Sequence, residues 1–197
     1  MSQPLDPGQG TTLRIARLIS ILGHPMLVMP LAAWLATRAK GSDGPTTLIL
    51  LSAIVGVGLI VFSFTVIQVR GGRWQHVDAS ATSERHALNV FLLGLFVATA
   101  ALAAWYFGSS PATLAVLLAA AIILLALLIS PWCKLSLHVA FGCFAIFVPG
   151  SLTVGVGLAV LVIAVAWSRL ILGRHELTDI FAGMLAGLAA GAAFQFF

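Results

Sequence analysis

Apolar residues occur in long blocks along this chain, separated by short polar segments. Five blocks approach or exceed the roughly 20 residues that cross a bilayer as a helix, at about residues 46–69, 87–107, 112–129, 152–167 and 176–197. Residues 13–37 are also apolar, but His24 and Pro25 interrupt them, and a shorter apolar helix is expected after His138, ending near Pro149. Blocks of this length predict helices in a membrane.

The pattern predicts an all-α protein, a polytopic transmembrane helical bundle of six to seven spans. A single membrane-embedded domain would cover residues 13–197, after a disordered polar tail at residues 1–12. Near the start, we expect an interfacial turn or two, a break at His24-Pro25 and then a first span, with His24 as a polar group at the break. Six spans result if this segment does not cross.

Composition supports a membrane protein. The mean hydropathy is +1.09, 60% of residues are hydrophobic and 8% are charged. The net charge of +4 comes from basic residues scattered between apolar blocks, so it forms no basic face and predicts no nucleic-acid partner. Neighbouring helices can approach closely at a small-residue stripe in the last block, made of Gly183, Gly187 and Gly191. The sequence leaves a homo-oligomer open.

The ionisable residues gather in three polar segments, at residues 70–86, 131–138 and 168–179. Two apolar blocks separate each segment from the next, so all three are predicted to meet at one membrane face. Ionisable groups beside membrane spans are costly, and they usually mark a functional site.

The last of these segments contains a histidine and an aspartate four residues apart. If residues 176 onward are helical, Asp179 can reach the imidazole of His175 and fix its tautomer. Such a histidine is a nucleophile or a base, and Arg169 is a nearby cation that could hold an anion for it. Taken alone, the pair could merely cap a helix end.

Together, the three segments supply cations, a hydroxyl and two histidines, which suit a phosphoryl group. The candidate site residues are Arg85, Lys134, Ser136, His138, Arg169, His175 and Asp179. Ser136 could instead cap the helix that follows it.

The pattern resembles the type 2 phosphatidic acid phosphatase (PAP2) superfamily. Ser168-Arg169, five residues, His175, three residues and Asp179 match its third signature without a gap, and Ser136-Leu137-His138 is similar to its second, usually Ser-Gly-His. The first signature, a lysine followed after six residues by Arg-Pro, is partly present. Arg85 fits its arginine, but Asp78 stands in the lysine position and His86 in the proline position.

The resemblance covers roughly residue 70 to the C-terminus and implies a haloperoxidase-like helical core. It also implies metal-independent hydrolysis of a phosphate ester or diphosphate, so no metal or cofactor is expected. His175 would form a phosphohistidine and Asp179 would hold it. His138 would protonate the leaving group, while Arg85, Arg169 and Ser136 would bind phosphoryl oxygens. Lys134 could supply the charge of the missing lysine.

A polar site at the end of membrane spans predicts an amphipathic substrate, namely a lipid phosphate. The surrounding membrane lipids are the other expected partners. We expect an integral protein of a bacterial or archaeal cell membrane, with the site at the cytoplasmic face because basic residues are in excess there. Two alternatives stay open. One is a non-catalytic relative, a transporter or assembly partner that binds lipid phosphate. The other is a metal-dependent intramembrane hydrolase with His138, His175 and Asp179 as ligands.

Overall fold

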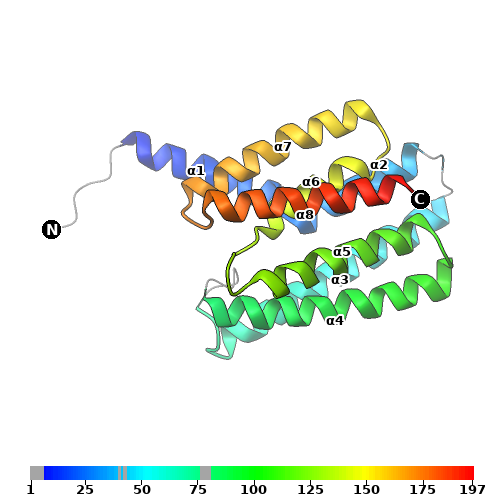
Figure 1. Ribbon diagram of the computed structural model, residues 1–197, viewed down its shortest axis with the longest axis horizontal. Helices are drawn as coiled ribbons and strands as arrows, with labels where there is room; N and C mark the ends of the chain where they lie inside the picture. The colour runs from blue at the N-terminus through cyan, green and yellow to red at the C-terminus, as the bar shows by residue number, and fades with distance from the viewer. Residues whose placement is uncertain (1–6, 40, 42–43, 76–80) are drawn as a thin grey trace.

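Eight α-helices make up the part of the chain that the structure describes, residues 7–39, 41, 44–75 and 81–197 of a computed structural model, and these residues form no strand. The helices are α1 (Pro7–Leu22), α2 (Pro25–Ala39), α3 (Gly44–Arg70), α4 (Thr82–Phe107), α5 (Pro111–Ile129), α6 (Leu137–Phe147), α7 (Leu152–Ile171) and α8 (Leu177–Gln195). They run roughly along one axis (Figure 1). The prediction of an all-α helical bundle is confirmed.

Five helices, α3, α4, α5, α7 and α8, are long and apolar enough to cross a membrane. A sixth span results if α1 and α2, which are bent by 49° at the break between them, cross as one. Both predicted counts, seven and six, included the segment after His138 as a span. Its helix, α6, has 11 residues, which at about 1.5 Å per residue cannot cross a core of about 30 Å alone. By length and composition, the described chain therefore has five or six spans.

Large apolar side chains face outward around the bundle. Trp105 of α4 is 90% exposed, Leu102 is 70% exposed and Ile163 of α7 is 70% exposed. Such a surface would be costly in water and is stable against lipid chains. The chain is therefore an integral membrane protein.

Three helix ends differ from the prediction. Because α1 begins at Pro7, residues 7–12, which were assigned to a disordered tail, are helical; residues 1–6 lie outside the described part. Helix α4 begins at Thr82 rather than near residue 87, since the Glu84 carboxylate accepts the backbone N–H of Ala81 (3.1 Å) and caps the first turn. Helix α7 continues past residue 167 to Ile171. As a result, helices rather than loops hold Arg85 and Arg169.

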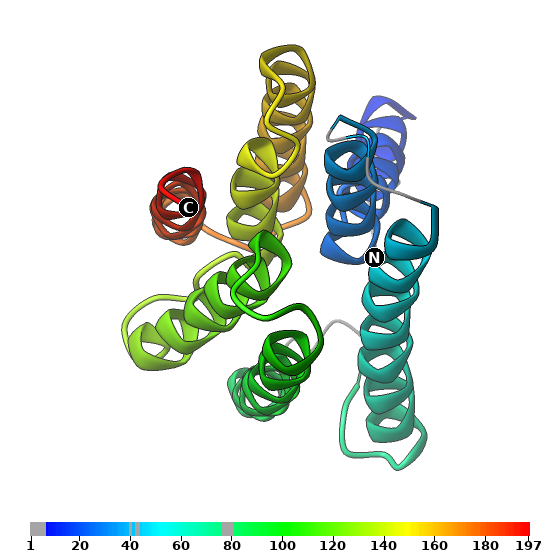
Figure 2. The same cartoon turned by 90° about the vertical axis from the view of Figure 1, so that its right-hand side faces the viewer.

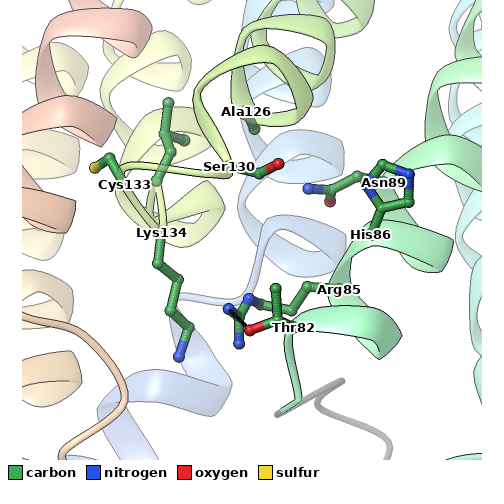
Figure 3. Close-up of a pocket in the computed structure, with 9 residues that line it drawn as sticks. Thr82, Arg85, His86, Asn89, Ala126, Ser130, Cys133 and Lys134 are labelled. Carbon is green, nitrogen blue, oxygen red and sulfur yellow. Dashed lines mark hydrogen bonds between the residues drawn. The ribbon is translucent and has the colours of Figure 1, made fainter.

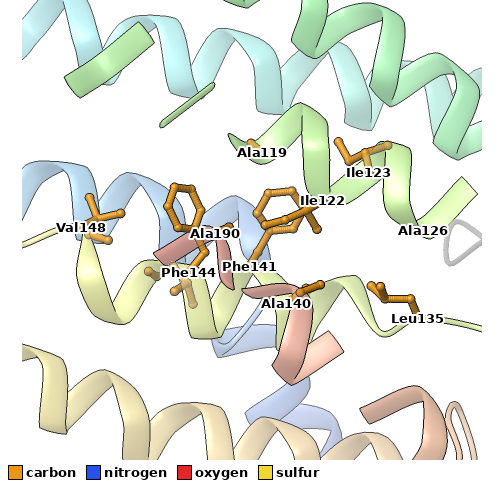
Figure 4. Packing of buried hydrophobic residues seen from close by; sticks show 14 of the residues in the cluster. Ala119, Ile122, Ile123, Ala126, Leu135, Ala140, Phe141, Phe144, Val148 and Ala190 are labelled. Atoms are coloured by element: carbon orange, nitrogen blue, oxygen red, sulfur yellow. The ribbon is translucent and has the colours of Figure 1, made fainter. Parts of the chain in front are cut away.

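The short helix α6 lies at the centre of the bundle. It packs against α2, α5, α7 and α8, and Figure 2 shows it between the α7 side and the α5 side. Val139, Ala140, Phe144 and Ala145 are each 0% exposed, and the two rings of Phe141 and Phe144 fill the space beside α5 (Figure 4). Residues 133–136, which lead into α6, are not helical. This connection brings the start of α6 into the bundle.

Glycines let α8 approach α6 closely. A Cβ added at Gly187 would lie 2.1 Å from the Ala140 carbonyl oxygen, and one at Gly183 would lie 2.6 Å from the Ser136 carbonyl oxygen. Both distances are far shorter than a van der Waals contact, so the two backbones could not lie at this separation with larger residues. The predicted small-residue stripe therefore fixes the position of the segment that carries Ser136.

We expect Gly187→Ala to destabilise the bundle by roughly 1–3 kcal/mol, as overpacking of a filled core does. The matched control is Gly94→Ala in α4, where an added Cβ meets nothing within 4 Å; it should be neutral or slightly stabilising, since alanine favours the helix. Thermal unfolding of both variants in detergent measures the difference. Equal stability of the two variants would contradict the close approach.

Candidate functional site

The structure brings the three polar segments together at one end of the bundle. The start of α4, the end of α5 and the α7–α8 turn lie at the same end, on the left in Figure 1. At the centre is the predicted pair of His175, in the α7–α8 turn, and Asp179, in the first turn of α8. His175 Nδ1 lies 3.3 Å from Asp179 Oδ2, and the two side chains are 7% and 9% exposed, respectively. The pair is therefore nearly sealed from solvent.

The Asp179 carboxylate also binds the connection between α5 and α6. Its Oδ1 accepts the backbone N–H of Lys134 at 3.0 Å and lies 3.6 Å from the Cys133 thiol. Its Oδ2 accepts the backbone N–H of Glu176 at 3.1 Å. A carboxylate with this many donors has little freedom to rotate. Asp179 both orients His175 and ties residues 133–134 to the start of α8.

The surroundings of His175 select one tautomer. Its Nδ1 lies 3.1 Å from the Lys134 carbonyl oxygen as well as beside Asp179, and both neighbours are acceptors. A neutral His175 satisfies them with its proton on Nδ1, so the lone pair is on Nε2. This is the arrangement that a nucleophilic or basic imidazole requires.

The pKa of His175 is lowered to about 4, first by burial and then by the charges of Arg169 and Lys134, while Asp179 acts in the opposite direction. The cause is that a charged imidazole is poorly solvated here and faces two cations. His175 is therefore neutral, with its lone pair available, at any pH well above 4.

Lys134 joins the connection before α6 to the α7–α8 turn. Its ammonium group donates to the Arg174 carbonyl oxygen at 2.7 Å. Burial and the charge of Arg85 lower the pKa of the Lys134 amine, while Asp179 raises it. Sequence reasoning considered Lys134 as a phosphate ligand. In the structure its ammonium group also holds the turn that carries His175.

Ser136 is completely buried, with 0% of its surface exposed. Its backbone N–H donates to the Asp179 carbonyl oxygen at 3.1 Å. Although Ser136 is the N-cap residue of α6, its side chain makes no capping hydrogen bond, and within the described residues its Oγ has no hydrogen-bond partner. A buried hydroxyl without a partner is costly, and it indicates a place for a polar ligand.

His138 and Arg169 complete the cluster from two further helices. His138 lies in the first turn of α6, within electrostatic range of Arg169 and His175. Arg169 lies in the last turn of α7, is 7% exposed, and donates from Nη1 to the Ser20 hydroxyl at 2.9 Å. A nearly buried guanidinium at this position is a fixed positive charge beside both histidines.

Arg85 reaches the cluster through Lys134. The two side chains line a small cavity between α4 and the end of α5, shown in Figure 3. Arg85 Nη2 donates to Thr82 Oγ1 at 3.1 Å. The other lining residues are Thr82, His86, Asn89, Ala126, Ser130, Cys133 and Leu135. All seven predicted site residues are thus gathered at one end of the bundle.

Three residues at the site were not predicted to belong to it. Cys133 contacts Asp179, Ser20 binds Arg169, and His24 stacks edge to face on His138. The sequence carries no local signal for these contacts, because Ser20 lies in α1, which ends at Leu22, whereas His24 lies in the break before α2.

The first polar segment also contains two acidic residues. The Glu84 carboxylate accepts hydrogen bonds from the backbone N–H groups of Gln75 and Ala81, both at 3.1 Å. Asp78, which stands in the position of the missing lysine, lies outside the described residues. Within the described part of the chain, no group of three His, Cys, Asp or Glu side chains is arranged to hold a metal ion.

No protein-family model matches the chain, and no curated protein or solved structure matches it.

We expect the imidazole of His175 to titrate near pH 4. NMR of the protein in detergent, with the histidine rings labelled, measures this titration. Lys134→Gln should raise this pKa, because it removes a positive neighbour. Asp179→Asn should lower it, because it removes the one group that favours the charged ring. Arg38→Gln, which removes an exposed cation of α2, is the control and should change nothing. Titration near the ordinary value of about 6.5 would contradict the burial of this ring.

Proposed function

We propose that this protein is a metal-independent phosphatase that hydrolyses a lipid phosphate or diphosphate through a phosphohistidine intermediate. The observation that carries the proposal is the neutral, aspartate-oriented His175 beside the buried Arg169 and the half-buried Lys134, at the end of an apolar bundle. The buried Ser136 hydroxyl adds support, because a phosphoryl oxygen would supply the hydrogen-bond partner that it lacks. The resemblance of these residues to the type 2 phosphatidic acid phosphatase signatures points the same way.

In the first step, the lone pair on His175 Nε2 attacks the phosphorus atom. A bound phosphate dianion would offset the charge of Arg169 and allow His138 to take up a second proton. The bond between phosphorus and the ester oxygen then breaks, and His138 gives this proton to that oxygen, so that an alcohol (or, from a diphosphate, a monophosphate) departs. Asp179 stabilises the positive charge that develops on the His175 ring. Arg169, Lys134 and Arg85 would neutralise the phosphoryl oxygens.

In the second step, water attacks the phosphorus atom of the phosphohistidine. His138, now neutral, takes a proton from this water, and the bond between phosphorus and Nε2 breaks. Inorganic phosphate leaves, and both histidines return to the states that they had with substrate bound. The two steps together consume one water molecule and require neither a metal ion nor a redox partner.

The position of the site supports a lipid substrate. The cluster lies where polar segments meet the ends of long apolar helices, so a substrate with a phosphate head and a hydrocarbon tail can reach it from the membrane. The candidates are polyprenyl phosphate or diphosphate, phosphatidic acid and phosphatidylglycerophosphate. We place the site at the cytoplasmic face of a bacterial or archaeal cell membrane, because Arg14, Arg17, Arg70 and Arg73 all belong to segments at the site end.

We expect the purified protein, in detergent with a chelator and no divalent metal, to release phosphate from at least one of these lipids. His175→Ala should lower kcat/KM by roughly 10³-fold or more, as deletion of a covalent nucleophile does. Ser52→Ala, an exposed position of α3, is the control and should retain full activity.

A brief reaction with ³²P-labelled lipid, quenched in alkali to preserve phosphohistidine, should label the wild-type protein and leave His175→Ala unlabelled. Binding of lipid phosphate without turnover would contradict the proposal that the protein is an enzyme, and it would favour a transporter or assembly partner. Activity that disappears with the chelator and returns with a divalent metal would favour a metal-dependent hydrolase.

Arg169→Lys should lower kcat/KM by roughly 10²-fold, comparable with the loss of one donor to a developing oxyanion. The reason is that a lysine ammonium group keeps the positive charge but lacks the planar guanidinium group, which can bind Ser20 and a phosphoryl oxygen at once. Arg38→Lys is the matched control. Equal rates for Arg169→Lys and the wild type, measured on the same lipid, would mean that charge alone suffices at this position.

A further inference from the structure

The break between α1 and α2 lies directly against the site. Helix α1 packs on α7, and α2 packs on α6. At the break, a Cβ added to Gly23 would lie 2.0 Å from Val165 Cγ2 of α7. The absence of a side chain at Gly23 therefore lets the end of α1 lie close to the helix that carries Arg169.

Ser20 of α1 is one of the two site contacts that this approach creates. Its hydroxyl accepts a hydrogen bond from Arg169 Nη1 at 2.9 Å, and Ser20 is 7% exposed. A buried hydrogen bond to a charged guanidinium fixes the direction of the fork. The other donors of Arg169 are then held in one orientation relative to the histidines.

His24 makes the second contact, with the ring of His138. The two ring centroids are 4.7 Å apart and the ring planes are at 89°, an edge-to-face arrangement. His24 is itself held in place, because its Nδ1 accepts the backbone N–H of Met26 at 3.2 Å and so caps α2. Since this nitrogen is an acceptor, a neutral His24 carries its proton on Nε2.

We propose that Ser20 and His24 are positioning residues of the phosphatase site, Ser20 for the phosphoryl-binding Arg169 and His24 for the proton-donating His138. The inference rests on the proposed function and assigns a role to the α1–α2 break, which lies outside the part of the chain that the resemblance covers. An imidazole held edge to face loses that contact when its ring plane tilts. His24 thus holds the ring plane of His138 in the orientation from which a proton passes to the leaving oxygen.

The two residues should produce different kinetic signatures. Loss of His24 affects proton donation, which an alkyl leaving group needs and a nitrophenyl leaving group does not. Loss of Ser20 affects the binding of phosphoryl oxygens, which both substrates share. The charged or titratable groups that face His138 are His24 from the break, Arg169 from α7 and His175 from the α7–α8 turn, and the variants leave the last two in place.

The experiment compares an alkyl phosphate and a nitrophenyl phosphate on the full-length protein in detergent. His24→Asn keeps an acceptor that can cap α2 and removes the ring. For the alkyl ester, His24→Asn should lower kcat/KM roughly ten- to hundredfold, which is part of what general acid catalysis contributes. For the nitrophenyl ester, the same variant should lower kcat/KM less than about threefold. Ser20→Ala should lower both roughly tenfold, the value of one hydrogen bond to a charged group. The controls are Ile21→Ala, an exposed neighbour on α1, and Ser52→Ala.

A second measurement does not depend on turnover. The ring ¹⁵N shifts of His138 report which nitrogen carries its proton. They should change in His24→Asn and stay unchanged in both controls, and Ser20→Ala should weaken the binding of orthovanadate, a phosphate analogue, relative to Ser52→Ala.

The outcomes separate the two proposals. If the wild type is active and His24→Asn slows both esters equally, or if Ser20→Ala has no effect, the positioning roles are wrong while the phosphatase stands. If the wild type releases no phosphate from any substrate, the proposed function is wrong. The positioning roles are then tested by the ¹⁵N shifts of His138 in His24→Asn and by vanadate binding in Ser20→Ala. If neither differs from the wild type, the positioning roles are wrong.

Discussion

The site depends on one buried carboxylate. The Asp179 carboxylate accepts hydrogen bonds from the backbone N–H groups of Lys134 and Glu176, and it also holds the imidazole of His175. The Ser136 N–H binds the backbone carbonyl oxygen of the same aspartate. In a membrane bundle, backbone groups of a non-helical segment need partners inside the protein, because lipid offers none. Asp179 therefore stabilises both the irregular segment before α6 and the orientation of His175 with the same two oxygens.

Close helix packing sets the depth of the site. Gly183 and Gly187 allow α8 to lie against the backbone of α6, and Gly23 allows α1 to lie against α7. Packing between membrane helices depends on such contacts, since lipid chains are as apolar as leucine and provide no hydrophobic drive for association. The short α6 can begin inside the bundle because glycines of α8 lie against it, and its start then places Ser136 beside Asp179 and His138 near His175.

The cations around His175 have two consequences. Arg169 and Lys134 disfavour a charged imidazole, which together with burial keeps the pKa of His175 at about 4 and its lone pair available. The same charges would attract a phosphate dianion. In the proposed reaction, an arriving phosphoryl group neutralises the cations that kept the ring uncharged, so that positive charge on His175 becomes less costly as the bond to phosphorus forms.

Several features followed from the sequence alone, because each depends on local pattern. Long apolar blocks determined the helices, and the four-residue spacing of His175 and Asp179 indicated their contact across the start of α8. Two apolar blocks between successive polar segments indicated that Arg85, Lys134 and His175 would share one end of the bundle. They do share it, although one of these blocks forms α6, which is too short to cross a membrane alone. The length of each helix was less certain, since the capping of α4 by Glu84 depends on a contact with the backbone before it.

The tertiary structure alone decided which distant residues touch. Ser20 and Arg169 are 149 positions apart, and no local pattern encodes that contact or the stacking of His24 on His138. The ammonium group of Lys134 bonds to the Arg174 carbonyl oxygen, a backbone acceptor that leaves no mark in the sequence. The physical reason is that periodicity fixes which face of a helix is polar, whereas the close approach of two helices fixes what that face meets.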